Sequence, residues 1–222
     1  MSHGVHNINV KTILKPNNMK RVSLTILLAC FALVLAAQNR DIKVNYKGAK
    51  PSISDFAWAL LSSNDNEEED CYDESFNAIK QAWMKHRKGL PLDEGETLTV
   101  DEKNGYICYE SKYEEHVGRW EMCYWNEADG KHKLFAYNVV SFSNGKYSPG
   151  QYDGIAFYRY NNATKKMKEC DDTGVDVVYH TGDNVFASYA LPRTGKDILV
   201  TIWYDNEPKK ITLKWKGRRF GK

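Results

Sequence analysis

The strongest constraint on the fold is a change of hydrophobic period after Leu92. Up to that point apolar residues recur at helical spacing. From Thr97 to Lys216 apolar and polar residues instead alternate with a period of two, which is typical of β-strands. In the last segment, Ile211, Leu213 and Trp215 alternate with Lys210, Thr212, Lys214 and Lys216. One face of that strand is therefore expected to be buried and the other wet, as in antiparallel sheets.

The alternation defines a series of short expected strands separated by turn residues. They span Thr97–Asp101, Gly105–Ser111, Arg119–Asn126, His132–Phe142, Gly154–Tyr160, Lys166–Cys170, Val175–His180, Val185–Leu191, Ile198–Tyr204 and Lys209–Lys216. Pairs such as Asn104-Gly105, Asp129-Gly130 and Asn144-Gly145 provide hairpin turns. Parallel pairing would need crossover helices, which this stretch lacks. We therefore predict an antiparallel β-meander that forms a sandwich or a barrel.

Two helices are expected before the strands. The first starts at Ser52 or Ser54 and has one apolar face. That face is formed by Ile53, Phe56, Ala57, Leu60 and Leu61. The second covers Asp73–Lys88, with basic residues in its last turn and Gly89 after it. The predicted fold class is therefore mainly β (α+β), with two N-terminal helices followed by the meander.

A secretory leader is expected inside the N-terminal region and not at residue 1. Met19-Lys20-Arg21 is followed by an apolar run from Val22 to Ala37, and small residues close the run before Gln38. A basic start, a short apolar core and a small-residue end are typical of a signal peptide. This pattern assigns residues 1–18 to an upstream extension and 19–37 to the signal peptide. The remainder divides into a helical segment, 38–92, and an antiparallel β domain, 93–222.

Two other interpretations of the leader stay open. Residues 1–18 can be a genuine cytoplasmic overhang on a signal anchor, although the apolar run is shorter than the roughly 20 residues that span a bilayer. Alternatively, Leu27-Leu28-Ala29-Cys30 resembles a lipobox, which would make this a lipoprotein anchored at Cys30. The apolar run continues for seven residues after Cys30, whereas a lipoprotein usually becomes polar there.

Removing the expected leader changes the sign of the net charge, which bears on the kind of partner the protein can bind. The full chain has 31 basic and 29 acidic residues, which gives a net charge of +2. Residues 1–37 contain four basic residues and no acidic ones, so the mature part has 27 basic against 29 acidic residues. The basic balance thus belongs to the leader. We expect no nucleic-acid partner, because such binding needs a concentrated basic face, and no membrane contact after cleavage.

Four cysteines remain in the mature chain, an even number that permits two disulfides in an exported protein. A symmetric hairpin centred between Glu115 and His116 would place Cys108 opposite Cys123. That pairing would leave Cys71 for Cys170. The alternative is four separate, half-buried thiols.

No motif identifies a metal site, a cofactor or a catalytic centre. The acidic run from Asp65 to Glu74 lacks the ligand spacing and central Gly of a calcium loop. The four histidines of the mature chain show no metal-binding spacing. No GxSxG elbow is present. A nucleophilic or two-carboxylate site whose residues meet only in space is not visible from spacing. We therefore expect no metal and no cofactor.

Aromatic density is the main functional indication, with 14 Tyr and six Trp in the chain. Many of these rings are expected to fill the core or to pair across strands. Asn144-Gly145 and Pro149-Gly150 interrupt the strand pattern around Tyr147 and Tyr152. The segment 143–153 is therefore expected to be a surface loop that presents these two tyrosines to a ligand.

The leader ending Leu35-Ala36-Ala37-Gln38 and the closing segment Asp197–Phe220 resemble small exported proteins of unknown function of the Bacteroidetes type. The resemblance covers the two ends of the chain and implies export. From it and the aromatic density we predict a periplasmic or secreted binding protein for a protein, peptide or glycan. The alternative is an envelope or extracellular hydrolase whose active site the sequence does not reveal.

Export gives the first testable prediction. When the chain is expressed from Met19, the protein should be found outside the cytoplasm with a mature N-terminus near Gln38. Cell fractionation and N-terminal mass spectrometry would check both points. A diacylated Cys30 would identify the lipoprotein, and an uncut cytosolic protein would contradict export.

Overall fold

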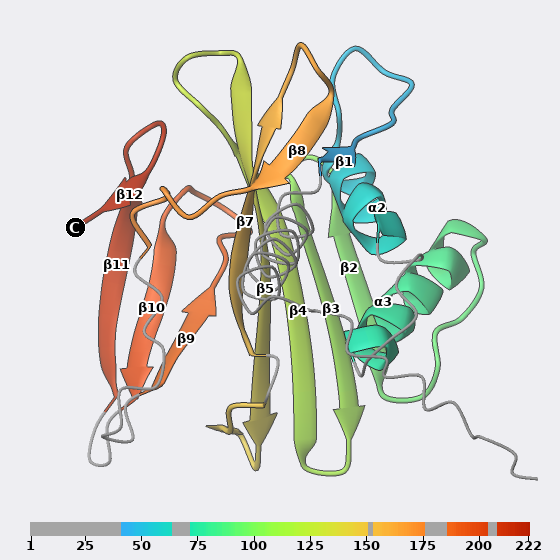
Figure 1. Cartoon of the computed structure of the whole chain (residues 1–222). Helices are drawn as coiled ribbons and strands as arrows, with labels where there is room; N and C mark the ends of the chain where they lie inside the picture. The colour runs from blue at the N-terminus through green and yellow to red at the C-terminus, as the bar shows by residue number, and fades with distance from the viewer. Residues whose placement is uncertain (1–40, 64–71, 151–152, 176–185, 204–207) are drawn as a thin grey trace, which may run out of the picture. The chain divides into compact units, whose positions relative to one another are not determined.

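The fold is mainly β and its sheets are antiparallel, as the alternation predicts. The computed structural model describes residues 41–63, 72–150, 153–175, 186–203 and 208–222 (Figure 1). All of them belong to one compact unit, Asp41–Lys222. The expected leader, residues 19–37 with Cys30, and the extension before it lie outside the described residues.

Two sheets contain the strands, and each strand pairs with antiparallel neighbours. The larger sheet has the order β1-β8-β7-β5-β4-β3-β2, with β6 added beside β5, and the smaller has the order β12-β11-β10-β9. The larger sheet comprises β1 (Ile42–Lys43), β2 (Glu96–Asp101), β3 (Tyr106–Tyr113), β4 (His116–Asn126), β5 (His132–Ser143), β6 (Lys146–Tyr147), β7 (Gly154–Asn161) and β8 (Lys166–Glu169). The smaller comprises β9 (Phe186–Ala190), β10 (Ile198–Trp203), β11 (Lys209–Trp215) and β12 (Phe220–Gly221).

The two expected helices are present as α2 (Ile53–Ser63) and α3 (Tyr72–Arg87). They are not the first elements, because β1 precedes α2 and pairs with β8 far along the chain. Of the expected strand Val175–His180, residues 176–180 lie outside the described part, and Val175 is not in a strand.

The larger sheet is buried on both faces, so it lies between two layers (Figure 1). Alternate residues face opposite ways: Ile107 packs with α2 and α3, whereas its neighbour Tyr106 packs with the smaller sheet. In β5, Phe135 faces the helices and Leu134 the smaller sheet. In this sheet, alternate residues along a strand therefore enter two different apolar cores. They do not alternate between a core and water.

The last long strand confirms the expected orientation of its side chains. Leu213 is buried, and Ile211 and Trp215 pack against the same core. Lys214 and Lys216 are exposed on the other side. Trp215 also contacts Phe220, with ring centroids 5.0 Å apart.

The expected register of the first long hairpin is wrong. Tyr113 pairs with His116, which leaves Glu114 and Glu115 as a two-residue loop. Glu114 adopts a φ of 51°, as tight hairpin loops require. Both strands therefore extend further toward the tip than expected, and the centre of the hairpin shifts by one residue.

That shift removes the basis for a Cys108–Cys123 disulfide. Cys108 lies opposite Glu121, and Cys123 lies opposite Tyr106. Cys108, Cys123 and Cys170 are all free thiols, so the proposed partner of Cys71 is also unbridged. Cys71 itself lies outside the described residues.

A buried polar cluster joins the two sheets. The Glu121 carboxylate, only 4% exposed, accepts hydrogen bonds from Tyr106 Oη (2.8 Å), Asn138 Nδ2 (3.0 Å) and the Leu191 backbone N–H (3.1 Å). Asn138 Nδ2 also donates to the backbone oxygen of Tyr189 (2.9 Å). Burial, followed by the Glu121 charge, raises the pKa of Tyr106, which stays protonated and continues to donate. Glu121 therefore fixes the segment around β9 against β3, β4 and β5.

Replacing Glu121 should test this connection. Glu121→Gln keeps the shape but turns an NH₂ group toward donors, so the free energy of unfolding should fall by about 1–3 kcal/mol. Urea denaturation of the variant would measure the change. Glu169→Gln is the matched control, since this glutamate is exposed on β8, and it should stay within about 0.5 kcal/mol. Equal stability of the two variants would contradict the role of the cluster.

Candidate functional site

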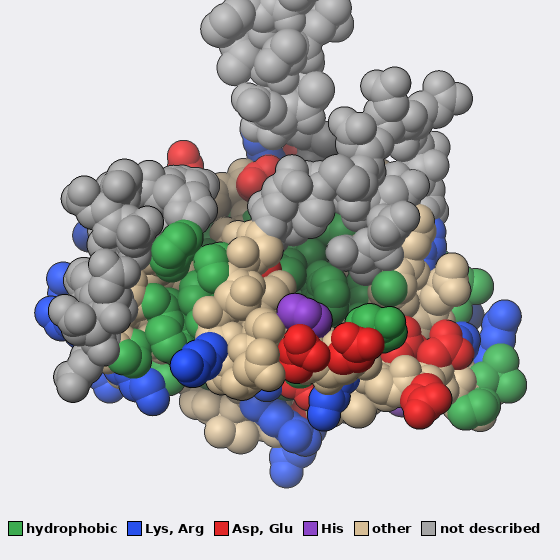
Figure 2. All heavy atoms as spheres, turned by 90° about the horizontal axis from the view of Figure 1, so that it is seen from below, with side chains coloured by type: hydrophobic (Ala, Val, Ile, Leu, Met, Phe, Trp, Pro, Cys, Tyr) green, Lys and Arg blue, Asp and Glu red, His purple; other side chains and the backbone are tan. Residues whose placement is uncertain are grey.

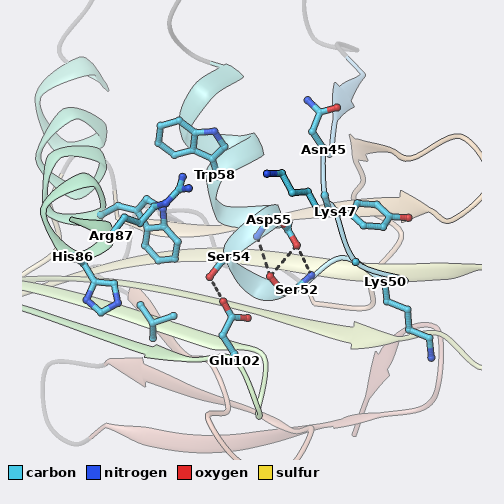
Figure 3. Close-up of a pocket in the computed structure, with 14 residues that line it drawn as sticks. Asn45, Lys47, Lys50, Ser52, Ser54, Asp55, Trp58, His86, Arg87 and Glu102 are labelled. Atoms are coloured by element: carbon cyan, nitrogen blue, oxygen red, sulfur yellow. Dashed lines mark hydrogen bonds between the residues drawn. The ribbon is translucent and has the colours of Figure 1, made fainter. Parts of the chain in front are cut away.

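A pocket of about 1020 Å³ lies where α2, α3 and the end of β2 meet (Figure 3). Its walls come from four segments: the loop after β1, the first turns of α2, the last turn of α3, and β2 with the residue after it. The lining residues are Asn45, Tyr46, Lys47, Gly48, Lys50, Ser52, Ser54, Asp55, Trp58, Trp83, His86, Arg87, Val100 and Glu102. This volume is at the upper end of the range for pockets that hold small organic ligands.

The start of α2 is fixed by its own side chains. Ser52 donates through its backbone N–H (2.8 Å) and its hydroxyl (2.9 Å) to Asp55 Oδ2, and the Asp55 N–H donates to Ser52 Oγ (3.4 Å). This is a reciprocal N-terminal cap. Ser54, in the first turn of α2, donates its hydroxyl to Glu102 Oε1 and connects α2 to the residue after β2. The helix cap needs only one of the two Asp55 carboxylate oxygens.

Aromatic side chains form much of the wall. Arg87 and Lys80 both lie near the ring of Trp58, each with its charged group 5.9 Å from the ring centroid. A cation at this distance is attracted by the ring. Tyr46 receives a hydrogen bond from Tyr160 Oη (3.4 Å) and has Lys165 Nζ 5.0 Å from its ring centroid.

Trp83 adds an unsatisfied donor to the pocket wall. It is 3% exposed, and its Nε1–H has no hydrogen-bond acceptor among the residues that the structure describes. A buried donor left without a partner is costly and is rare in folded proteins.

Three cations of the pocket have no ion-pair partner among the described residues, although Asp55 and Glu102 line the same pocket. Lys47, Lys50 and Arg87 are exposed and form no ion pair with any residue that the structure describes. In Figure 3 the side chains of Arg87 and Lys47 extend toward α2 from α3 and from the loop after β1. Burial, followed by the nearby Lys50 ammonium, lowers the pKa of Lys133 on β5. The arrangement can attract and orient an anion.

Tyr147, the ligand-binding residue expected from sequence, is placed elsewhere and has structural partners. Asn144-Gly145 closes a tight hairpin, so Tyr147 lies in β6 and pairs with Phe142 of β5. Its ring stacks on Trp203 at 5.3 Å, and its hydroxyl donates to the backbone oxygen of Ala187 (3.3 Å). Burial raises its pKa. Tyr152 lies outside the described residues.

Figure 2 shows the end of the molecule that carries the tips of β3, β4 and β5, where hydrophobic side chains lie beside a separate group of acidic ones. Tyr147 contributes to the aromatic contacts near this end. Its ring is half-buried, so part of it reaches solvent, as expected. Its neighbours, however, hold it in place without a ligand.

The cysteines are not activated nucleophiles. Burial raises the pKa of Cys108 and of Cys170 to about 11 each, and raises that of Cys123 well above its ordinary value. Thiols with such pKa values stay protonated at neutral pH and react slowly. These three side chains therefore act as small apolar residues in the core between the sheets.

Within the described part of the chain, one group of side chains has oxygen and nitrogen atoms close enough to hold a metal: Glu127, Asp129 and His132. Each already has a protein partner. Glu127 binds Arg159 Nε (2.7 Å), His132 Nδ1 binds Asp129 Oδ2 (2.6 Å), and the other His132 nitrogen contacts Asn161 Nδ2 (3.1 Å). The group therefore works as the closure of the hairpin between β4 and β5.

Sequence reasoning missed the pocket because its parts lie far apart in the chain. Lys47 and Lys50 fall in a polar stretch without periodicity, and β1 is only two residues long. The basic end of the second helix was recognised, but its last-turn charges have an ordinary explanation in the helix dipole. The available signal was Trp58, which lies outside the apolar stripe of its helix.

Neither a family model, nor a curated protein, nor a solved structure matches this chain. The function must therefore be argued from the site itself. Within the described part of the chain, no helix combines the length and apolar character needed to cross a bilayer.

The contact between Asp129 and His132 leads to a prediction about acid. The hydrogen bond from His132 and the backbone N–H of Lys131 lower the pKa of Asp129 from 3.8 to about 2. Because the folded-state pKa is the lower one, this stabilisation is present above about pH 4 and disappears as the pH falls toward 2. Asp129→Asn should thus lose less stability than the wild type over that interval, as measured by urea denaturation. Glu94→Gln, an exposed acid without a side-chain hydrogen bond, should follow the wild type.

Proposed function

We propose that this protein is an exported binding protein whose ligand is anionic and occupies the pocket between α2, α3 and β2. The observation that carries the proposal is the set of unpaired cations, Lys47, Lys50 and Arg87, on an aromatic wall. Even exposed ion pairs contribute little to the free energy of unfolding. Exposed cations without an ion-pair partner therefore have no evident role in stabilising the fold. Arg87 and Lys47 extend toward α2 from two sides of the pocket (Figure 3), and a ligand of opposite charge explains this arrangement.

The location of the protein follows from the leader. We place it in the periplasm or outside the cell, with the basic start and apolar core of residues 19–37 as the support. A protein, a peptide or a glycan can supply the negative charge.

The fold suits a binding module. The two sheets form a sandwich in this proposal, supported by the apolar cluster that both contribute to. The pocket lies on the other side of the larger sheet, beside the helices. A rigid core thus holds the pocket walls without the ligand, which favours affinity.

Hydrolysis is a second candidate, because two carboxylates, Asp55 and Glu102, share the pocket. A pair of carboxylates can cleave glycosidic bonds when one acts as an acid. Asp55, however, caps α2 through one of its oxygens, which ties it to the helix. Product analysis after incubation with polygalacturonate distinguishes the two functions: shortened chains that disappear with Glu102→Gln would establish the hydrolase.

Removing the pocket cations should abolish anion binding. We expect the wild type to bind at least one of three fluorescein-labelled polymers, namely polygalacturonate, polyglutamate and heparin, in an anisotropy titration. The combined variant Lys47→Ser, Lys50→Ser, Arg87→Ser should bind it at least tenfold more weakly, which corresponds to about 1.4 kcal/mol.

The matched control removes the same charge elsewhere. Lys112, Lys131 and Lys168 are exposed, lie outside the pocket and form no ion pair with described residues. Their combined replacement by Ser should leave binding nearly unchanged. Equal losses in both triple variants would mean that the attraction is general and that the pocket is not the site.

A further inference from the structure

The pocket contains donors and acceptors in a mixture that limits its ligand. This step rests on the anion-binding function proposed above. The donors are Arg87, Lys47 and Lys50, none of which forms an ion pair with a described residue. Arg87 lies beside the Trp58 ring, which leaves the planar edge of its guanidinium available. That edge fits a carboxylate through two parallel hydrogen bonds.

The acceptors argue against a densely charged anion. Asp55 and Glu102 line the same pocket, and each uses only one carboxylate oxygen in a hydrogen bond. The remaining oxygens would repel a phosphate or sulfate cluster, because like charges at short range are unfavourable. They would instead accept hydrogen bonds from hydroxyl groups, as would the Asn45 side-chain amide oxygen on the rim.

The apolar part of the wall and the volume of the pocket also limit which ligands can bind. Tyr46, Trp58 and Val100 provide surface suited to the C–H face of a ring. A volume of about 1020 Å³ exceeds what a single small anion fills. The ligand should therefore be larger than one anion, with sparse negative charge, many hydroxyl groups and flat apolar faces.

We infer that the pocket binds a uronic-acid oligosaccharide, with Arg87 on a carboxylate and Glu102 on ring hydroxyls. Each sugar residue of such a chain carries one carboxylate, several hydroxyl donors and an apolar face. This combination matches the cations, the free carboxylate oxygens and the aromatic wall. An exported location would bring the protein into contact with extracellular polysaccharides of this class.

Isothermal titration calorimetry with trigalacturonate and its methyl ester tests the inference. The two probes share their rings and hydroxyl groups, but the ester lacks the charges. The wild type should bind trigalacturonate at least tenfold more tightly than the ester, and Arg87→Lys should weaken binding by about tenfold because lysine lacks the planar fork. Arg219→Lys, an exposed position outside the pocket, should have no effect.

Glu102→Ala gives the sharpest test, because the sign of its effect differs between ligand classes. The variant should bind trigalacturonate several-fold more weakly, since hydroxyl acceptors are lost. Its melting temperature is measured alongside, and Glu102→Gln, which keeps an acceptor oxygen, should recover part of the affinity. Tighter binding by Glu102→Ala would show that the carboxylate only repels the ligand and would overturn the inference.

The failures of the two proposals can be told apart. If a sulfated trisaccharide, inorganic phosphate or an acidic peptide binds in an Arg87-dependent way and trigalacturonate does not, the uronic-acid inference is wrong and anion binding stands. Equal affinity for the acid and its methyl ester also overturns the inference. If none of these probes binds the wild type, both proposals are wrong.

Discussion

Burial of both faces of the eight-stranded sheet is the constraint on which the rest of the structure depends. Adjacent residues such as Tyr106 and Ile107 enter different cores, so neither face can be left to water. The helices cover one face and the smaller sheet covers the other. Two apolar cores on one sheet remove far more surface from water than either could alone, and this is the main favourable term in folding.

The same layering explains where a binding pocket can form. The start of α2 and the end of α3 lie near β2, where side chains from these three elements meet the loop after β1. In this corner the capping serine and Asp55 have a structural task, as does Ser54 on Glu102. Among the described residues, Lys47 and Lys50 have no ion pair, and Arg87 contacts only the ring of Trp58. A group that stability does not need is the kind that function retains.

Much of the fold could be predicted from sequence because local periodicity records it. Both helices and most strands lie within one to four residues of their expected ends, since apolar spacing follows from how each element presents one face to a core. Apolar spacing does not predict the register between β3 and β4. The turn Glu114-Glu115 contains no Gly or Asn, so sequence does not indicate its position. An error of one residue in the centre of the hairpin changes the residue opposite Cys108 from Cys123 to Glu121.

The site was harder to predict because aromatic content alone does not distinguish a ligand surface from a core. Tyr147 in β6 and Trp58 in α2 both carry half-buried rings. Tyr147 has a stacked neighbour and an acceptor for its hydroxyl, so nothing about it is incomplete. Trp58 instead lies beside Arg87, whose charge has no acid among the described residues, and it shares its pocket with Trp83, whose donor is unsatisfied. Cations without an acidic partner beside an aromatic ring, and not the rings themselves, distinguish this pocket, and they become visible only when distant segments are brought together.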